Sequence, residues 1–545
     1  MYKNYIKRLK LNKLRRIMRG YRALKQSGQI DRISKLKESL TENSLNISRE
    51  KFSMIIYGEQ GFKCAELITR QYLLLRIGGI NLNRALLYSL GKKNSRVIFP
   101  LPKNWIEQLS SHGFKVNKAA SLILWNFYLI TALGYGFTQY FRIGFSRGMR
   151  SRSFNSEKPP EKYVYFHNLV KENLPIETSG KFNIINWYLL WSEREVDIEC
   201  IKHSVRNVQS IYLENIAVKY QDGPIPGLLG LVARTKFLLW GIATTMLAAI
   251  DLLRGHWWHA LLLNQSATMH HLLLTKNYLL AKEYFFHNSS WLYRPLWTYE
   301  AESRGASISL YFYSTNCEGF KVDENQTPIP YGWRAMSWSR YLVWDECQAE
   351  FVRRAIGKGA NIVVAGEIWF QDSLLNLSIP PKNYIAIFDI QPVRRSFYES
   401  LGLGFEYYVS NIAIKFLADI KDIANDINLS LILKRKREIG GLIHPSYEYF
   451  MQLNAGLKNY FEAPPELNAK KIIQESLAVI SMPYTSTALL AKFAGVPSVY
   501  YDPTGLLCKD DPAAHGIPIL SGRLELEQWL RKISAELNAN GAERD

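Results

Sequence analysis

The sequence predicts an α/β protein that contains two doubly wound, mostly parallel sheets and a basic helical N-terminal extension. The chain has 545 residues, which is too long for one ordinary hydrophobic core. Hydrophobic residues make up 47% of it, which is enough to form two cores. Short apolar runs alternate with helical patterns along most of the chain. The composition changes at residues 376–383, which include Pro380 and Pro381, so we place a domain boundary near residue 380.

Residues 1–50 are predicted to form the helical extension. Between Lys3 and Lys25 the chain carries many Lys and Arg residues and no acidic residue, interleaved with apolar residues at helical spacing. A basic amphipathic helix is typical of a segment that lies on an anionic membrane surface, and a solvated basic extension is the alternative. The net charge of +20 also suits nucleic acid. However, no nucleic-acid recognition module follows the basic segment, so we predict no nucleic-acid partner.

Residues 51–380 are predicted to form the first α/β domain, with helical insertions. Helical periodicity dominates residues 200–290, and a further helix is predicted at residues 341–356. The apolar runs predicted to be strands are residues 52–57, 96–99, 163–166, 307–313 and 361–365.

Two apolar segments of this domain raise the question of membrane insertion. Residues 119–141 are uncharged but contain polar residues such as Asn126. Residues 237–250 are shorter than the roughly 20 residues that a membrane span needs. We therefore expect both segments to form buried core helices, with insertion into one leaflet and a true span as the alternatives.

Residues 381–545 show the clearest alternation of strands and helices. The predicted strands are residues 384–390, 429–433, 478–481 and 497–501, and the predicted helices are residues 412–427, a segment near Tyr447, and residues 486–493. This alternation predicts a parallel, Rossmann-like sheet whose ligands bind at the C-terminal ends of the strands. The amphipathic tail at residues 524–537 is expected to cross back onto the first domain.

The cysteines indicate a reducing compartment. There are five, none in a C-x-x-C pair, which argues against a disulfide framework and against a zinc site. The N-terminus has no apolar secretory core followed by a small-residue cleavage site. We therefore predict a cytoplasmic protein, peripheral on the inner face of the cell membrane.

The most informative segment is residues 479–504, where a strand, a turn and a helix follow one another. The hydroxyl residues Thr485, Ser486 and Thr487 begin the helix, where free N–H groups can bind a phosphate. Ordinary N-capping by these hydroxyls is the alternative. Asp502 ends the next strand, where it can contact a ribose or form an Asx turn.

A cationic cluster follows the strand at residues 429–433. Lys434, Arg435 and Lys436 can neutralise the phosphate of a leaving nucleotide. His444 and Pro445 then begin a helix, although a His-Pro dipeptide also occurs often by chance. The sequence contains no convincing D-x-D metal motif, so we predict a metal-independent reaction with no cofactor.

The stretch SMPYTSTALLAKFAGVPSVYYDP, from Ser481 to Pro503, resembles the signature of the polysaccharide biosynthesis PFTS-motif family. Tyr484 stands where the name of the motif has Phe. The resemblance extends over the C-terminal half and includes residues 294–297, 313–316, 344–345 and 388–392. It implies a GT-B-like fold of two Rossmann-like domains and a role in bacterial O-antigen, capsule or related surface glycan synthesis. The His444-Pro445 pair is similar to the His-Pro motif of bacterial GT-B sialyltransferases, which implies a CMP-activated donor.

Carboxylates of the first domain are the candidates for the general base that deprotonates the acceptor hydroxyl. Glu300 lies in a segment that resembles the family, Glu367 directly follows a predicted strand, and Asp345 lies at a strand–helix junction. A solvated or capping carboxylate is the alternative role for each of them.

Together these features predict a glycosyltransferase that moves a sugar from a nucleotide donor to an acceptor. The expected partners are the nucleotide-sugar, a lipid-linked or growing glycan, and an anionic membrane surface. The alternatives are a nucleotide-sugar epimerase or polyol-phosphate transferase on the same fold, and a non-catalytic scaffold at the membrane surface.

Overall fold

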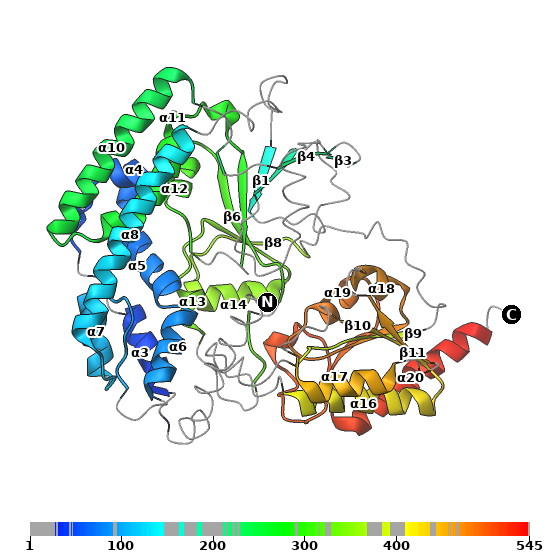
Figure 1. Ribbon diagram of the computed structural model, residues 1–545. Helices are drawn as coiled ribbons and strands as arrows, with labels where there is room; N and C mark the ends of the chain where they lie inside the picture. Colours follow the sequence, from blue (N-terminus) through cyan, green and yellow to red (C-terminus); the bar gives the residue numbers. More distant parts are fainter. Residues whose placement is uncertain are drawn as a thin grey trace.

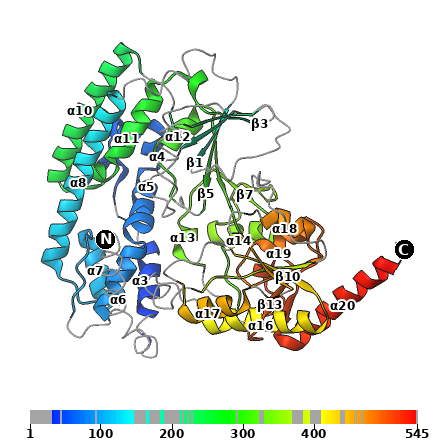
Figure 2. The same ribbon diagram turned by 45° about the vertical axis from the view of Figure 1, so that its right-hand side comes forward.

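The computed structural model describes most of residues 31–145, 229–367 and 384–542, together with four strands between residues 163 and 220. These residues form a helical N-terminal part, a first α/β domain and a second α/β domain at the C-terminal end (Figures 1 and 2). The basic segment between Lys3 and Lys25 lies outside the described residues.

The N-terminal part is helical as far as Gly144. Its α-helices are α3 (Asp31–Glu42), α4 (Met54–Lys63), α5 (Ala65–Tyr72), α6 (Ile80–Leu90), α7 (Lys103–Ser111) and α8 (Lys118–Gly144). The strands predicted at residues 52–57 and 96–99 are therefore wrong. The first segment enters α4, and the second contributes only an isolated bridge between Val97 and Val116. A short apolar run fits a strand and a buried helix equally well, and Ile56 and Tyr57 are buried on a helix.

Three long helices pack together on one side of the molecule (Figure 1). They are α8, α10 (Leu231–Leu253) and α11 (Trp258–Leu274). By length and composition α8 and α10 could cross a membrane, and only 22% and 28% of their most apolar windows are buried. The prediction that these segments are buried core helices is wrong, and α11, buried along most of its length, lies behind them. The helix α10 also includes residues 231–236, so it is longer than the apolar run at residues 237–250.

The first domain contains an eight-stranded sheet in the order β3-β4-β2-β1-β5-β6-β7-β8. The strands are β1 (Tyr163–His167), β2 (Asn183–Trp187), β3 (Ile211–Leu213), β4 (Ile216–Tyr220), β5 (Glu283–His287), β6 (Ser307–Tyr311), β7 (Arg340–Val343) and β8 (Ile362–Val364). All neighbours are parallel except β3 and β4. The helix predicted at residues 341–356 is in part β7, and its remainder is α14 (Glu346–Ile356). The strand order reverses between β1 and β5, which makes that point the topological switch point.

The second domain contains a six-stranded, fully parallel sheet in the order β11-β10-β9-β12-β13-β14. The strands are β9 (Tyr384–Phe388), β10 (Ser430–Lys434), β11 (Tyr460–Ala463), β12 (Ala478–Ser481), β13 (Ser498–Asp502) and β14 (Ile519–Ser521). The helices are α16 (Ser410–Asp426), α17 (Pro445–Asn454), α18 (Ala469–Glu475), α19 (Thr487–Phe493) and α20 (Gly522–Ala542). Numbered within the domain, this is the strand order 3-2-1-4-5-6 of a dinucleotide-binding sheet, with its switch point between β9 and β12.

The C-terminal helix α20 stays on its own domain. It packs against α16, β13 and β14, with Leu526 and Leu530 fully buried in the core. The prediction that this tail crosses back onto the first domain is therefore wrong.

The two sheets face each other with the C-terminal ends of their strands. Thr315, which follows β6, is hydrogen-bonded to Ser486, which follows β12. The ring of Phe320 contacts the rings of Tyr484 and Tyr500, so apolar packing continues across the interface. Two facing parallel α/β domains with added helices form the predicted GT-B-like architecture. The last strand of the first sheet, β8, ends before residue 380, and the first strand of the second sheet, β9, begins after it.

Candidate functional site

Asp389 lies at the switch point of the second sheet, directly after β9. Its side chain is buried, and its Oδ2 accepts a hydrogen bond from the Tyr447 hydroxyl on α17. Its Oδ1 is also buried and has no hydrogen-bond partner among the described residues. Burial raises the pKa of Asp389 to about 6, although the Tyr447 hydroxyl and the Arg435 guanidinium both lower it. A buried carboxylate oxygen without a donor is costly, unless a ligand supplies the donor.

The sequence prediction did not include Asp389 among the site residues. The signal was present, because an aspartate directly follows the wholly apolar strand YIAIF, all five residues of which are buried. The sequence alone does not reveal the strand order, and it is the strand order that places this end of β9 at the switch point.

The predicted cationic cluster is largely occupied by contacts within its own domain. The Lys434 Nζ donates to the Arg435 carbonyl oxygen at 2.7 Å, and Lys434 is buried. The Arg435 guanidinium forms an ion pair with Glu462 of the neighbouring strand, 2.7 Å away. Lys436 lies outside the described residues. Lys434 and Arg435 thus flank the switch point as fixed charges.

His444 and Pro445 connect α17 to the segment after β9. His444 is the N-cap of α17, and its Nδ1 accepts a hydrogen bond from the Ser446 N–H. The His444 N–H donates to the carbonyl oxygen of Pro392 at 2.9 Å. Pro445 is the first residue of the helix, where a missing N–H costs nothing. The same helix presents Tyr447 to Asp389, so the His-Pro pair positions one wall of the switch-point site.

The hydroxyls of the turn after β12 are used within the protein. Ser486 Oγ accepts hydrogen bonds from both the N–H and the hydroxyl of Thr315 in the first domain. Thr485 Oγ1 donates to the Met482 carbonyl oxygen, and Thr487 Oγ1 is hydrogen-bonded to Ser481. Ser486 is the N-cap residue of α19, yet its side chain forms no capping hydrogen bond. Ser486 therefore does not act as an ordinary side-chain N-cap.

Asp502 forms a turn. Its Oδ1 accepts from the N–H and the hydroxyl of Thr504, and its Oδ2 accepts from the Leu507 N–H. Asp502 is fully buried. This arrangement favours the Asx-turn role over a ribose contact.

Of the three carboxylates predicted to supply a general base, Glu300 lies away from the facing strand ends. It belongs to α12 (Trp297–Ser303), is buried, and its Oε1 accepts the Gln60 N–H of α4 at 2.6 Å. This contact holds α12 against α4. Glu367 follows β8 and forms an ion pair across the interface with Lys470 of α18, at 2.6 Å. It lies at the facing edges but is paired.

Asp345 is bound across the domain interface. As N-cap of α14 its Oδ1 accepts the Gln348 N–H, and its Oδ2 is 2.7 Å from the Nδ1 of His515 in the second domain. Burial alone would raise the pKa of Asp345, but the hydrogen bond and charge of His515 hold it below its ordinary value. Among the described residues, ligand atoms of Asp345, Cys347 and His515 lie within 4.8 Å of one another, a set that could hold a metal ion. The predicted absence of a metal therefore stays a prediction.

Two histidines lie at the switch point of the first sheet. His167 ends β1 and His287 ends the neighbouring strand β5. Burial, His287 and Arg76 all lower the pKa of His167 well below its ordinary value, so its imidazole is neutral at pH 7. The sequence prediction missed both residues because β1 and β5 are separated by more than 100 residues along the chain.

The segments that resemble one family meet at the facing edges. Thr315 binds Ser486, and Asp345 binds His515. The Tyr484 hydroxyl donates to the Phe320 carbonyl oxygen at 3.3 Å. Tyr484 has a φ of 70°, the left-handed region, which aims its ring at the first domain.

Comparisons with solved structures found low similarity over most of the chain. Medicago truncatula UGT71G1 complexed with UDP-glucose is 10% identical, with a TM-score of 0.34, over 69% of this chain and 90% of that chain. The S. aureus MnaA–UDP structure is 10% identical, with a TM-score of 0.34, over 68% and 87%. The Methanocaldococcus jannaschii UDP-GlcNAc 2-epimerase is 12% identical, with a TM-score of 0.33, over 69% and 93%. At these scores the fold assignment rests on the strand order described above.

A comparison with curated proteins found no match. The sequence model of the family described as "Polysaccharide biosynthesis PFTS motif protein" matches residues 240–530, which is more than half of the chain and includes every segment on which the resemblance was based. The chain belongs to the polysaccharide biosynthesis PFTS motif protein family.

Proposed function

We propose that the protein is a glycosyltransferase that transfers a sugar from a nucleotide donor to a glycan or lipid-linked acceptor in the synthesis of a bacterial surface polysaccharide such as O-antigen or capsule. The observation that carries this proposal is the buried Asp389 carboxylate, whose Oδ1 has no donor within the described part of the chain, at the switch point of a sheet with the 3-2-1-4-5-6 order. A ribose or base of the donor offers the O–H or N–H group that this oxygen lacks.

In this proposal the donor lies along the C-terminal edge of the second sheet. Asp389 accepts a hydrogen bond from the nucleoside, and Lys434 and Arg435 place positive charge near the phosphate. The turn at Thr485–Thr487 borders the same edge, and hydrogen bonds within the protein hold its side-chain oxygens in place. A CMP-activated sugar is the donor that we expect, with His444 and Pro445 near the nucleoside.

The acceptor lies against the first domain in this proposal, and its hydroxyl is deprotonated by a group of that domain. Asp345 and Glu367 lie at the facing edge, whereas Glu300 serves to join two helices. The neutral His167 is a further candidate base at the switch point. We propose that the reaction needs no cofactor and takes place in the cytoplasm, on the inner face of the cell membrane.

A thermal-shift titration against CMP, CDP, UDP and GDP tests the proposal. A ligand at about 100 times its Kd stabilises the native state by about 2.7 kcal/mol, so one nucleotide should raise the unfolding temperature selectively. We expect this nucleotide to be CMP. The absence of a shift with all four would contradict the transferase proposal and favour a scaffold. Product analysis with the matching sugar donor then separates transfer from epimerisation, which needs no acceptor, and from phosphotransfer, which leaves phosphate in the product.

A further inference from the structure

Among the residues that the structure describes, the helices α8 and α10 are packed tightly on one side only. They run antiparallel, and small residues bring their backbones close: Gly144 lies against Leu238, and Gly241 lies against Tyr140. Gly136 of α8 lies against Leu263 of α11. The inner sides of both helices are thereby covered by each other and by α11.

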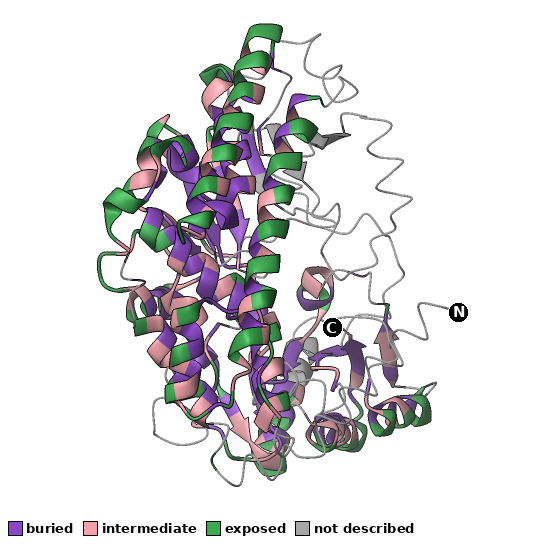
Figure 3. Cartoon of the chain, turned by 60° about the vertical axis from the view of Figure 1, so that its left-hand side comes forward, coloured by how far each residue is buried: buried purple, intermediate pink, exposed green. Residues whose placement is uncertain are grey.

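The outer sides carry a continuous row of exposed apolar residues. In Figure 3, which brings this side of the molecule forward, the long outer helices carry exposed residues along much of their length. Phe127 is 67% exposed and Val232 is 86% exposed, values that belong to residues with almost no protein contact. The other large apolar residues exposed on the two helices are Ile123, Leu124, Ile130, Tyr135, Phe137, Phe141, Leu231, Leu239, Ile242, Met246, Ile250 and Leu253. A soluble surface does not normally expose so large an apolar patch without a partner.

The charges on these helices are confined to their ends. The segment between Lys118 and Arg142 contains no charged residue. The segment between Lys236 and Arg254 contains only Asp251, which is buried. Burial of the outer face in an apolar medium therefore desolvates no charge, while cations remain at its rim.

Threonine hydroxyls on the outer face are satisfied by the helices themselves, and Asn126 is a further exposed polar residue of α8. The hydroxyls of Thr131 and Thr138 donate to the carbonyl oxygens of Phe127 and Tyr135, each at 2.8 Å. Thr235 donates to the Leu231 carbonyl oxygen at 3.0 Å. A hydroxyl that already donates within its own helix costs little to transfer into lipid.

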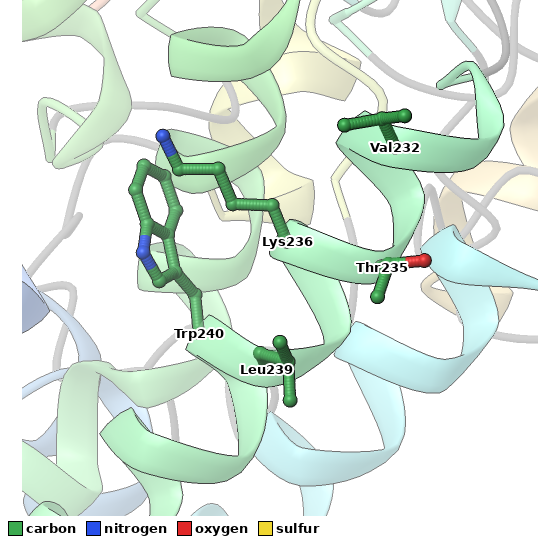
Figure 4. Close-up of a pocket in the computed structure, with 5 residues that line it drawn as sticks. All are labelled: Val232, Thr235, Lys236, Leu239 and Trp240. Carbon is green, nitrogen blue, oxygen red and sulfur yellow. The ribbon is translucent and has the colours of Figure 1, made fainter.

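One end of the face combines a cation with an aromatic ring. A surface pocket at the start of α10 is lined by Val232, Thr235, Lys236, Leu239 and Trp240 (Figure 4). The Lys236 ammonium lies 4.8 Å from the centroid of the Trp240 ring. A tryptophan and a lysine beside aliphatic residues are typical of the boundary between lipid headgroups and acyl chains.

We infer that the outer face of α8 and α10 inserts into one leaflet of an anionic phospholipid membrane, with both helices parallel to the membrane plane. The pair lies in the plane because its inner side is joined to α11 and through it to the rest of the protein. Phospholipid is the occupant that the chemistry favours, because the face is apolar along its length and cationic at its rim. This inference concerns the proposed membrane location and does not depend on the donor or on sugar transfer.

Sedimentation of the full chain with liposomes of phosphatidylcholine and phosphatidylglycerol tests this inference. The test variant combines Phe127→Glu, Leu239→Glu and Met246→Glu, at residues that are 67%, 60% and 60% exposed. A matched control combines Tyr449→Glu, Leu453→Glu and Leu524→Glu in the second domain, at residues that are 62%, 61% and 69% exposed. At about 1 M salt, where charge attraction is screened beyond about 3 Å, we expect the wild type and the control to sediment. The test variant should bind at least about tenfold more weakly, because its three carboxylates must be desolvated.

A deletion of residues 1–30 separates this face from the basic N-terminus. We expect the deletion to remove only the part of the binding that salt weakens. The inference is overturned if the test variant, with an unchanged unfolding temperature, sediments like the wild type, or if about 1 M salt releases the wild type completely. It is also overturned if gel filtration shows a wild-type dimer that the test variant loses while neither binds lipid, because a second copy of the chain would then cover the face.

Discussion

Replacing Asp389 with asparagine is expected to weaken nucleotide binding by about 10- to 100-fold, because a hydrogen bond to a charged group contributes about 1.5–3 kcal/mol. Asparagine keeps the shape of the side chain and an oxygen that can accept from the Tyr447 hydroxyl. It removes the negative charge from the buried switch-point oxygen, which has no hydrogen-bond partner among the residues that the structure describes. The measurement is the Kd of the nucleotide that gives the largest thermal shift with the wild type.

The same substitution is expected to stabilise the unliganded protein at neutral pH. Burial raises the pKa of Asp389 from 3.8 to about 6, so the folded state binds a proton that the unfolded state releases. The contribution of Asp389 to the stability of the wild type is therefore fully present below pH 3.8, and it is lost as the pH rises through about 6. The full effect is on the order of 3 kcal/mol. In urea unfolding at several pH values, the free energy of unfolding of the variant should rise relative to that of the wild type between about pH 4 and pH 6. Above about pH 6 the difference between the two free energies should be constant.

Asp419 provides the matched control. It is a buried aspartate of the same domain that also accepts a hydrogen bond from a tyrosine, Tyr501, at 2.6 Å, but it is paired with Lys415 at 2.9 Å. We expect Asp419→Asn to destabilise the protein, because Lys415 loses its counter-charge, and to leave the nucleotide Kd unchanged. If Asp389→Asn behaves in the same way, then Asp389 is structural and the donor site lies elsewhere.

The second domain was predictable because its local patterns and its tertiary structure agree. The strands at 384–388 and 478–481 are short, wholly buried and mostly apolar runs, and the next described element after each is a helix, α16 or α19. The first half of the chain lacks this agreement. The run FSMIIY satisfies a strand pattern, yet its buried residues face α11, and only the tertiary contact decides that it is helical. Likewise, the apolar sequence of α8 predicts burial, but the described part of the chain packs against it on one side only.

The site was predictable only where function depends on residues that are close in the sequence. The turn Thr485–Thr487 and the pair His444-Pro445 could be proposed from the sequence because each is a local motif. The contacts Thr315–Ser486 and Asp345–His515 join residues about 170 positions apart, and no spacing rule reveals them. Asp389 has a special role only because the strand order brings β9 next to β12.

Replacing Asp345 with alanine is expected to destabilise the protein by about 2–4 kcal/mol. The loss of the α14 N-cap costs about 1 kcal/mol, and the His515 Nδ1, buried without its acceptor, costs about 1–3 kcal/mol more. Asp345→Asn removes the charge but keeps one acceptor oxygen, and Oδ1 lies within reach of both the Gln348 N–H and the His515 Nδ1, 2.9 Å away, so its effect should be smaller. Glu346→Ala is the control, because this neighbouring carboxylate is exposed and its surface ion pair with Arg353 is screened by solvent and contributes little to stability. Urea unfolding of the three variants gives these differences directly.

The pH dependence of the Asp345 contact distinguishes a structural role from a catalytic one. Since the contact with His515 lowers the pKa of Asp345 below 3.8, its contribution to stability is present above that pH and is lost as the pH falls through the lower, folded-state value. The wild type should therefore lose stability in acid more steeply than Asp345→Asn. If instead Asp345→Asn unfolds like the wild type at every pH but loses sugar transfer at neutral pH, the carboxylate is the acceptor's general base. If it loses stability and keeps its transfer rate per folded molecule, Asp345 holds the two domains together and the base is another group of the first domain, with Glu367 and His167 the next to replace.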